Sequence, residues 1–129
     1  MTSDEQAITN VLADYAHLVD SGDFDGAAGL WIPEGVMRVF NRDVVGRAAI
    51  AEFLAGAYRG KHLGGAPAMA IDSDRATVRS GYAFWLASDL SLSSLGRYED
   101  TFVHADEGWS LEHRKIVIEF PARPSPSSE

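Results

Sequence analysis

Two side chains far apart in the sequence, Asp20 and His62, are of the types that do acid–base chemistry without a cofactor. Asp20 lies in the last turn of an expected amphipathic helix, where the helix dipole presents partial negative charge and disfavours a carboxylate. Gly22 stops that helix and Asp23 caps the next one, so Asp23 has a structural role and Asp20 has none. The alternative interpretation of Asp20 is a carboxylate that is simply solvated in a turn.

His62 stands at the start of an expected strand, residues 61–72. Period-two alternation would place Gly64, Ala66 and Ala68 on the same face as the imidazole. Such small residues leave room in front of the sheet for a cavity or for a closely packed helix. The alternative interpretation of His62 is a surface residue or a hydrogen-bonded structural one.

One further carboxylate falls among aromatic residues. Asp100 shares a strand face with Tyr98 and Phe102. Depending on the register of the hairpin, it would meet either His113 or Arg114, and a structural ion pair is the expected role.

Composition limits the classes of function. The chain of 129 residues carries a formal net charge of −8, which argues against nucleic acids and anionic membranes as partners. It contains no cysteine, which excludes disulfides and thiolate chemistry, and its four histidines lack the close spacing of zinc ligands. The first residues do not read as a signal peptide, and no run is long enough to cross a bilayer. A cytoplasmic, cofactor-independent protein is the expectation.

The helices that would position these residues come first in the sequence, and the strands follow in hairpin order. This order predicts an α+β domain with helices packed on one face of a curved antiparallel sheet. One domain is expected over residues 5–120, followed by a mobile tail rich in proline and serine over residues 121–129. Helices are expected at 4–20, 23–31 and 47–58, and strands at 36–40, 44–45, 61–72, 75–88, 92–105 and 109–120.

The order and spacing of several loose motifs resemble a known family. They are Tyr15-x-x-x-x-Asp-x-Gly-Asp-x-Asp, a helix after Gly46, a strand that starts with His62, Gly96-Arg-Tyr-x-Asp and Gly108-Trp-Ser-Leu-x-x-Arg. Together they resemble the SnoaL-like branch of the nuclear transport factor 2-like superfamily over roughly residues 5–120. The resemblance implies a cone in which a curved antiparallel sheet wraps three helices around a deep apolar pocket.

Within that superfamily, two segments are most similar to scytalone dehydratase and to a dehydrochlorinase. The segment around Asp20 matches the one that carries their catalytic aspartate, and the segment around His62 matches the one that carries their catalytic histidine. The resemblance therefore implies an Asp–His dyad. The chain departs from the dehydratase at Val19, where that enzyme has a tyrosine, and at Gly96 and Tyr98, where it has a serine and an asparagine, so scytalone is not the expected substrate.

The resulting hypothesis is a lyase or isomerase, similar to a dehydratase, a dehydrohalogenase or a polyketide cyclase, that acts on a small hydrophobic cyclic compound. His62 would be the base, Asp20 would orient it, and Tyr98 or Tyr15 would donate a hydrogen bond to the developing oxyanion. A non-catalytic binding or accessory protein is the main alternative, and a structural interaction module with a filled pocket is the third. The candidate substrate-binding residues are Trp31, Phe53, Tyr58, Tyr82, Phe84 and His113.

A homodimer is also expected, because the outer face of such a sheet is not covered by helices. Alternation along the strands would place apolar side chains on that face. They are Leu63, Met69, Ile71, Ala83 and Trp85.

Overall fold

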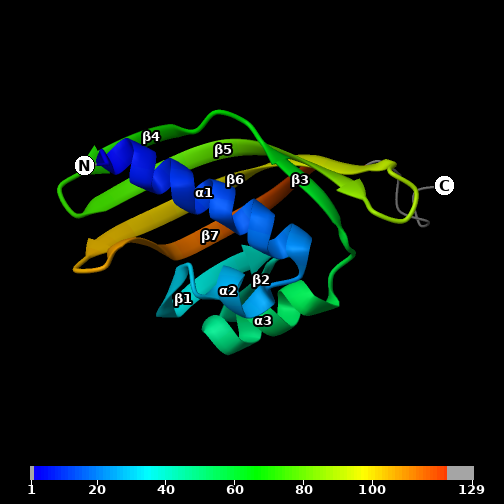
Figure 1. Cartoon of the computed structure of the whole chain (residues 1–129), viewed down its shortest axis with the longest axis horizontal. Helices are drawn as coiled ribbons and strands as arrows, with labels where there is room; N and C mark the ends of the chain where they lie inside the picture. The colour runs from blue at the N-terminus through cyan, green and yellow to red at the C-terminus, as the bar shows by residue number, and fades with distance from the viewer. Residues whose placement is uncertain (1, 122–129) are drawn as a thin grey trace.

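Three helices and one curved, open sheet of seven strands make up residues 2–121, the part of the chain that the computed structural model describes (Figure 1). The sheet has the order β2-β1-β7-β6-β5-β3, and β4 pairs with β5 beside β3. This confirms the expected α+β class, although β1 and β7 run parallel while the other pairs are antiparallel. The expected tail, apart from Pro121, lies outside the described residues. The elements are α1 (Asp4–Ser21), α2 (Phe24–Ala28), β1 (Trp31–Val39), β2 (Arg42–Val45), α3 (Arg47–Gly56), β3 (Gly60–Gly64), β4 (Ala68–Asp72), β5 (Arg75–Leu86), β6 (Leu92–Ala105) and β7 (Gly108–Pro121).

Helix α1 begins and ends at the residues that the sequence marks. The Ser3 side chain accepts a hydrogen bond from the main-chain N–H of Gln6, and Gly22 ends the helix in the left-handed conformation, with φ 86°. Asp23 caps α2 through the N–H of Gly26. Helix α2 is shorter than expected, because β1 already starts at Trp31.

The expected strand over residues 61–72 is wrong, because the structure divides it into β3 and β4. Pro67 has no N–H to donate to a sheet and lies in the break between the two strands. The break reverses which residues face the helices: His62 pairs with Phe84, whereas Met69 pairs with Val78. Met69, and with it Ile71, therefore packs against the core and is not on the outer face. Leu63, Ala83 and Trp85 do lie on the face opposite His62.

The hydrophobic core lies between the helices and the inner face of the sheet. Helix α1 lies across that face and contacts β3 and β7, while α2 and α3 cover the end at β1 and β2 (Figure 1). None of the helices in residues 2–121 is long and apolar enough to cross a membrane. The largest fully buried apolar side chains are Trp31, Phe102, Ile8, Met37, Ile50, Leu111 and Val78.

Candidate functional site

Asp20 and His62 are hydrogen-bonded neighbours, although 42 positions separate them in the sequence. The distance from His62 Nδ1 to Asp20 Oδ1 is 2.7 Å. The main-chain N–H of His62 also donates to the same carboxylate, at 3.2 Å to Oδ1 and 3.0 Å to Oδ2. An ionised carboxylate only accepts hydrogen bonds, so Nδ1 must carry the proton in this contact, and a neutral ring then has its lone pair on Nε2.

Basic residues next to His62 explain why a carboxylate is tolerated in the last turn of α1. Arg59 Nη2 donates to the main-chain oxygen of Asp20 at 2.9 Å, and Lys61 Nζ lies 3.6 Å from Asp20 Oδ2. Positive charge at a helix C-terminus offsets the unfavourable end of the dipole. The Asp20 side chain is only 12% exposed, so the interpretation of a solvated turn residue is wrong.

The imidazole is held between two aromatic side chains. The Phe84 ring lies at a centroid distance of 4.4 Å from the His62 ring and tilts from it by 31°, and Tyr15 presents an edge at 6.4 Å. A Cβ at Gly60 would overlap the Phe84 ring and the Trp85 carbonyl. The absence of a side chain at Gly60 thus allows β3 to approach β5 closely enough for this contact.

A cavity of about 260 Å³ opens beside His62, between α1 and the inner face of the sheet. Its wall combines apolar side chains with the phenols of three tyrosines. The lining residues are Thr9, Leu12, Ala13, Tyr15, Ala16, His17, Lys61, His62, Leu63, Gly64, Gly65, Pro67, Ser80, Tyr82, Tyr98 and Arg114.

Arg114, which lines this cavity, belongs to a second carboxylate–cation pair. Asp100 accepts hydrogen bonds from Arg114 Nε at 2.8 Å and from Nη2 at 2.9 Å, because β6 and β7 pair these two residues directly. This confirms the expected ion pair and identifies its partner as Arg114. His113 faces the other side of the sheet, opposite Thr101.

The Arg114 guanidinium carbon lies 3.9 Å from the centre of the Tyr98 ring and 4.4 Å from that of Tyr15. Burial raises the pKa of Tyr15 and raises that of Tyr98 well above the ordinary value. Burial lowers the pKa of Arg114, but the charge and hydrogen bonds of Asp100 outweigh it, so the pKa of Arg114 is raised. The two phenols and the guanidinium therefore stay protonated at neutral pH.

Six of the ten residues proposed from the sequence gather here. Asp20, His62, Tyr15, Tyr98 and Tyr82 surround or line the cavity, and Phe84 lies behind the imidazole as its packing partner.

The other four residues lie elsewhere. Trp31 is fully buried in the core, and its indole N–H donates a hydrogen bond to the Val36 carbonyl. Phe53 and Tyr58 line a separate hollow of about 860 Å³ between β2 and α3, where Tyr58 is 82% exposed. Helical periodicity indicates that such residues are apolar and face inward, but it does not specify which cavity they face.

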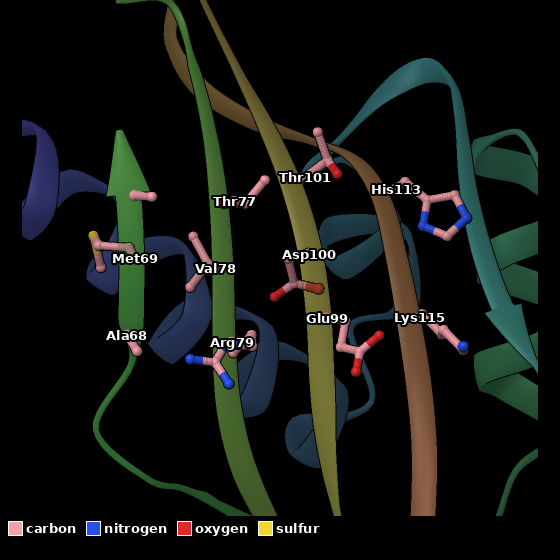
Figure 2. A pocket seen from close by; sticks show the side chains of 11 residues that line it. Ala68, Met69, Thr77, Val78, Arg79, Glu99, Asp100, Thr101, His113 and Lys115 are labelled. Carbon is pink, nitrogen blue, oxygen red and sulfur yellow. The ribbon is translucent and has the colours of Figure 1, made fainter. Parts of the chain in front are cut away.

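His113 lines a hollow of about 640 Å³ on the outer face of the sheet (Figure 2). This surface includes charged side chains: Figure 2 shows Arg79, Glu99 and Lys115 on neighbouring strands, with the helices behind the sheet. His113, expected to bind substrate, does not line the cavity beside His62, because a bulge near Thr101 shifts the register of β6 and β7 and turns this side chain outward.

Sequence reasoning missed Arg114, Lys61 and Ser80 as cavity residues. The available signal was the position of Arg114 opposite Asp100, which indicated an ion pair but not that the pair lies beside a cavity. Within residues 2–121, no group of three or more potential ligands is arranged to hold a metal ion.

The chain belongs to the SnoaL-like domain family, whose model matches residues 1–115. No curated protein matches the sequence significantly.

Solved structures agree with this fold. A variant of Rv3472, a protein of unknown function from Mycobacterium tuberculosis, is 23% identical with a TM-score of 0.84, covering 95% of this chain and 78% of that one. An NTF2-like protein with a cystatin-like fold from Novosphingobium aromaticivorans is 24% identical with a TM-score of 0.83, covering 96% and 85%. A protein from the same organism, described provisionally as a scytalone dehydratase, is 22% identical with a TM-score of 0.76, covering 95% and 93%. These likenesses establish the nuclear transport factor 2-like fold.

Proposed function

We propose that this protein is a cofactor-independent lyase or isomerase in which Asp20 and His62 form an acid–base dyad. The hydrogen bond of 2.7 Å between Asp20 Oδ1 and His62 Nδ1, with the imidazole lining the cavity, is the observation that carries this proposal. Membership of the SnoaL-like family and the likeness to a structure described as a scytalone dehydratase are consistent with it.

In the proposed reaction, His62 Nε2 accepts a proton from a substrate carbon next to a carbonyl group. The electrons of that C–H bond pass into the carbonyl, whose oxygen becomes an enolate. Asp20 stabilises the imidazolium that forms, and Tyr98 or Tyr15 donates a hydrogen bond to the enolate oxygen. The proton then returns either to another carbon, which is an isomerisation, or to a departing hydroxyl group, which is an elimination.

A non-catalytic binding protein of the same fold is the alternative. A cavity lined by tyrosines and apolar side chains suits binding equally well. The Asp20–His62 contact favours catalysis, because simple apolar binding does not require an oriented imidazole.

Substitution of the dyad tests the proposal, after a screen of cyclic ketones, hydroxyketones and halogenated rings has supplied a substrate. His62→Ala, His62→Gln and Asp20→Asn should each lower the rate by about 10²–10⁴-fold, the usual range for general-base catalysis. The double substitution should lower it little further, because the two residues act as one unit. Affinity for the compound should change much less than the rate.

The matched control is Asp14→Asn, which replaces an exposed carboxylate on the same helix and should leave the rate unchanged. An Asp20→Asn rate within about threefold of the unmodified protein would exclude the dyad mechanism. A protein that binds these compounds without turning any of them over would instead be the binding module.

We also propose a homodimer through the outer face of the sheet. Leu63 is 54% exposed there, and Leu95, which like Leu63 pairs with Ala83, is 38% exposed. Light scattering at micromolar concentration should give twice the monomer mass, and a monomer mass would refute the proposal.

A further inference from the structure

The charges that line the cavity beside His62 have one sign. The lysine and arginine residues in its wall are Lys61 and Arg114, and none of the lining residues is an aspartate or a glutamate. The chain as a whole has 19 acidic residues and 11 basic ones. The charged residues in the wall are therefore basic, although each has a carboxylate partner, Asp20 for Lys61 and Asp100 for Arg114.

The two nearby carboxylates lie behind their partners. Asp20 holds the imidazole of His62, and Asp100 holds the Nε and Nη2 atoms of Arg114 with a side chain that is 0% exposed. Neither carboxylate lines the cavity. Their partners His62 and Arg114 do line it, and the guanidinium lies deep in the wall against the rings of Tyr98 and Tyr15.

Within residues 2–121, one buried nitrogen atom of Arg114 has no hydrogen-bond acceptor, although the guanidinium also acts on the Tyr15 phenol, whose pKa is raised by burial and lowered by the hydrogen bond of Arg114. Its side chain is 1% exposed, and within the described part of the chain its Nη1 atom has no hydrogen-bond partner. A buried N–H without an acceptor is unfavourable, and hydrogen bonds between a guanidinium and an ionised oxygen are among the strongest in proteins. The buried hydroxyl-bearing residues Ser80 and Tyr98 add possible donors in the same wall.

We propose that this cavity takes a ring-bearing organic anion, with its carboxylate or ionised hydroxyl group at the Arg114 end. Leu12, Ala16 and Pro67, together with the tyrosine rings, provide an apolar surface for the ring. The inference rests on the proposed function in that the anion would be the substrate of the dyad. It narrows the substrate class from hydrophobic cyclic compounds to cyclic compounds that carry an acidic oxygen.

Benzoate and benzamide test this directly, because they match in shape and differ in charge. Their affinities for the full chain are measured by titration calorimetry at about pH 8, above the ordinary imidazole pKa. We expect benzoate to bind at least tenfold more tightly. Equal affinities, tighter binding of benzamide, or no binding of either compound at millimolar concentration would overturn the proposal.

Two variants then test whether Arg114 is the residue that binds the anionic group. Asp100→Leu combined with Arg114→Met removes both buried charges together and should reduce the preference for benzoate to less than threefold. Lys61→Gln, at the more exposed cation, should retain most of it. The reverse result, in which Lys61→Gln abolishes the preference and the double variant keeps it, would overturn the assignment.

If the double variant does not fold, Arg114→Lys provides the second measurement. This change keeps the positive charge but loses the fork geometry that lets Nε and Nη2 bind Asp100 while Nη1 stays available. It should lower benzoate affinity and leave benzamide affinity unchanged, and equal losses for both compounds would count against the proposal. All these experiments measure affinity. If the dyad substitutions did not lower turnover, the proposed function would be refuted, but the preference for benzoate over benzamide would be unaffected.

Discussion

Each of two carboxylates near this cavity binds a basic side chain, but the surroundings of the two pairs differ sharply. Asp20 joins helix α1 to strand β3 through His62, with both side chains partly exposed, at 12% and 17%. Asp100 and Arg114 are opposed residues on β6 and β7, with side chains that are 0% and 1% exposed. The hydrogen-bond distances are nearly the same, at 2.7 Å for the first pair and 2.8 and 2.9 Å for the second.

The difference separates two uses of the same kind of contact. Histidine can take up and release a proton near neutral pH, whereas arginine does not lose its proton in proteins. A partly exposed imidazole beside a cavity is therefore suited to proton transfer. A sealed guanidinium is a fixed positive charge, which holds the Tyr15 and Tyr98 rings in place.

The largest expected effect comes from breaking the sealed pair. Arg114→Met leaves the Asp100 carboxylate buried without compensation, which should lower the free energy of unfolding by about 3–5 kcal/mol. Urea denaturation measures the loss. Combining Arg114→Met with Asp100→Leu should restore part of that stability, because no uncompensated charge remains. A double variant less stable than Arg114→Met would show that the cost does not come from the stranded carboxylate.

A smaller loss is expected from the partly buried pair, Asp20 and His62. Asp20→Ala removes the acceptor for both the imidazole and the main-chain N–H of His62, which should lower the free energy of unfolding by about 1–3 kcal/mol. Water can reach these groups and replace part of the interaction. Urea denaturation against Asp14→Ala, an exposed site on the same helix where a change within about 0.5 kcal/mol is expected, provides the comparison. A loss as large as that of Arg114→Met would contradict the distinction between the pairs.

Local chemistry made the ends of α1 predictable from the sequence. Ser3 and Gly22 act through neighbouring main-chain groups, so a single sequence contains the information needed. The same local reasoning found no structural role for Asp20, but the structure shows that its carboxylate also accepts a hydrogen bond from the main-chain N–H of His62. Its contact with His62 depends on where β3 returns to the end of α1, and only the family resemblance pointed to it.

The face of the sheet on which each strand residue lies depended on the register of the strands, which periodicity does not determine. The break at Pro67 reversed the faces of Met69 and Ile71, and the bulge near Thr101 placed His113 on the outer face. A one-residue shift moves every following side chain to the other face of a sheet. For that reason, Asp100 could be paired with Arg114 or with His113 from the sequence, and the cavity wall could not be assigned.

The smallest expected effect concerns pH, and it sharpens the comparison because the buried phenols pack against the sealed pair. Burial raises the pKa of Tyr15 and Tyr98 in the folded protein, while in the unfolded chain a tyrosine titrates near its ordinary value of about 10. As the pH rises through about 10, the unfolded chain loses these protons first and binds fewer of them than the folded protein. Stability should therefore be unaffected by these groups at neutral pH and should fall as the pH rises above about 10.

Tyr98→Phe keeps the ring against Arg114 but removes one titrating group, so its unfolding midpoint in urea should fall less steeply with pH. Tyr58→Phe, at a phenol that is 82% exposed, should leave the slope as it is in the unmodified protein. Parallel slopes for Tyr98→Phe and Tyr58→Phe would mean that burial beside Arg114 does not hold the Tyr98 phenol in its protonated form.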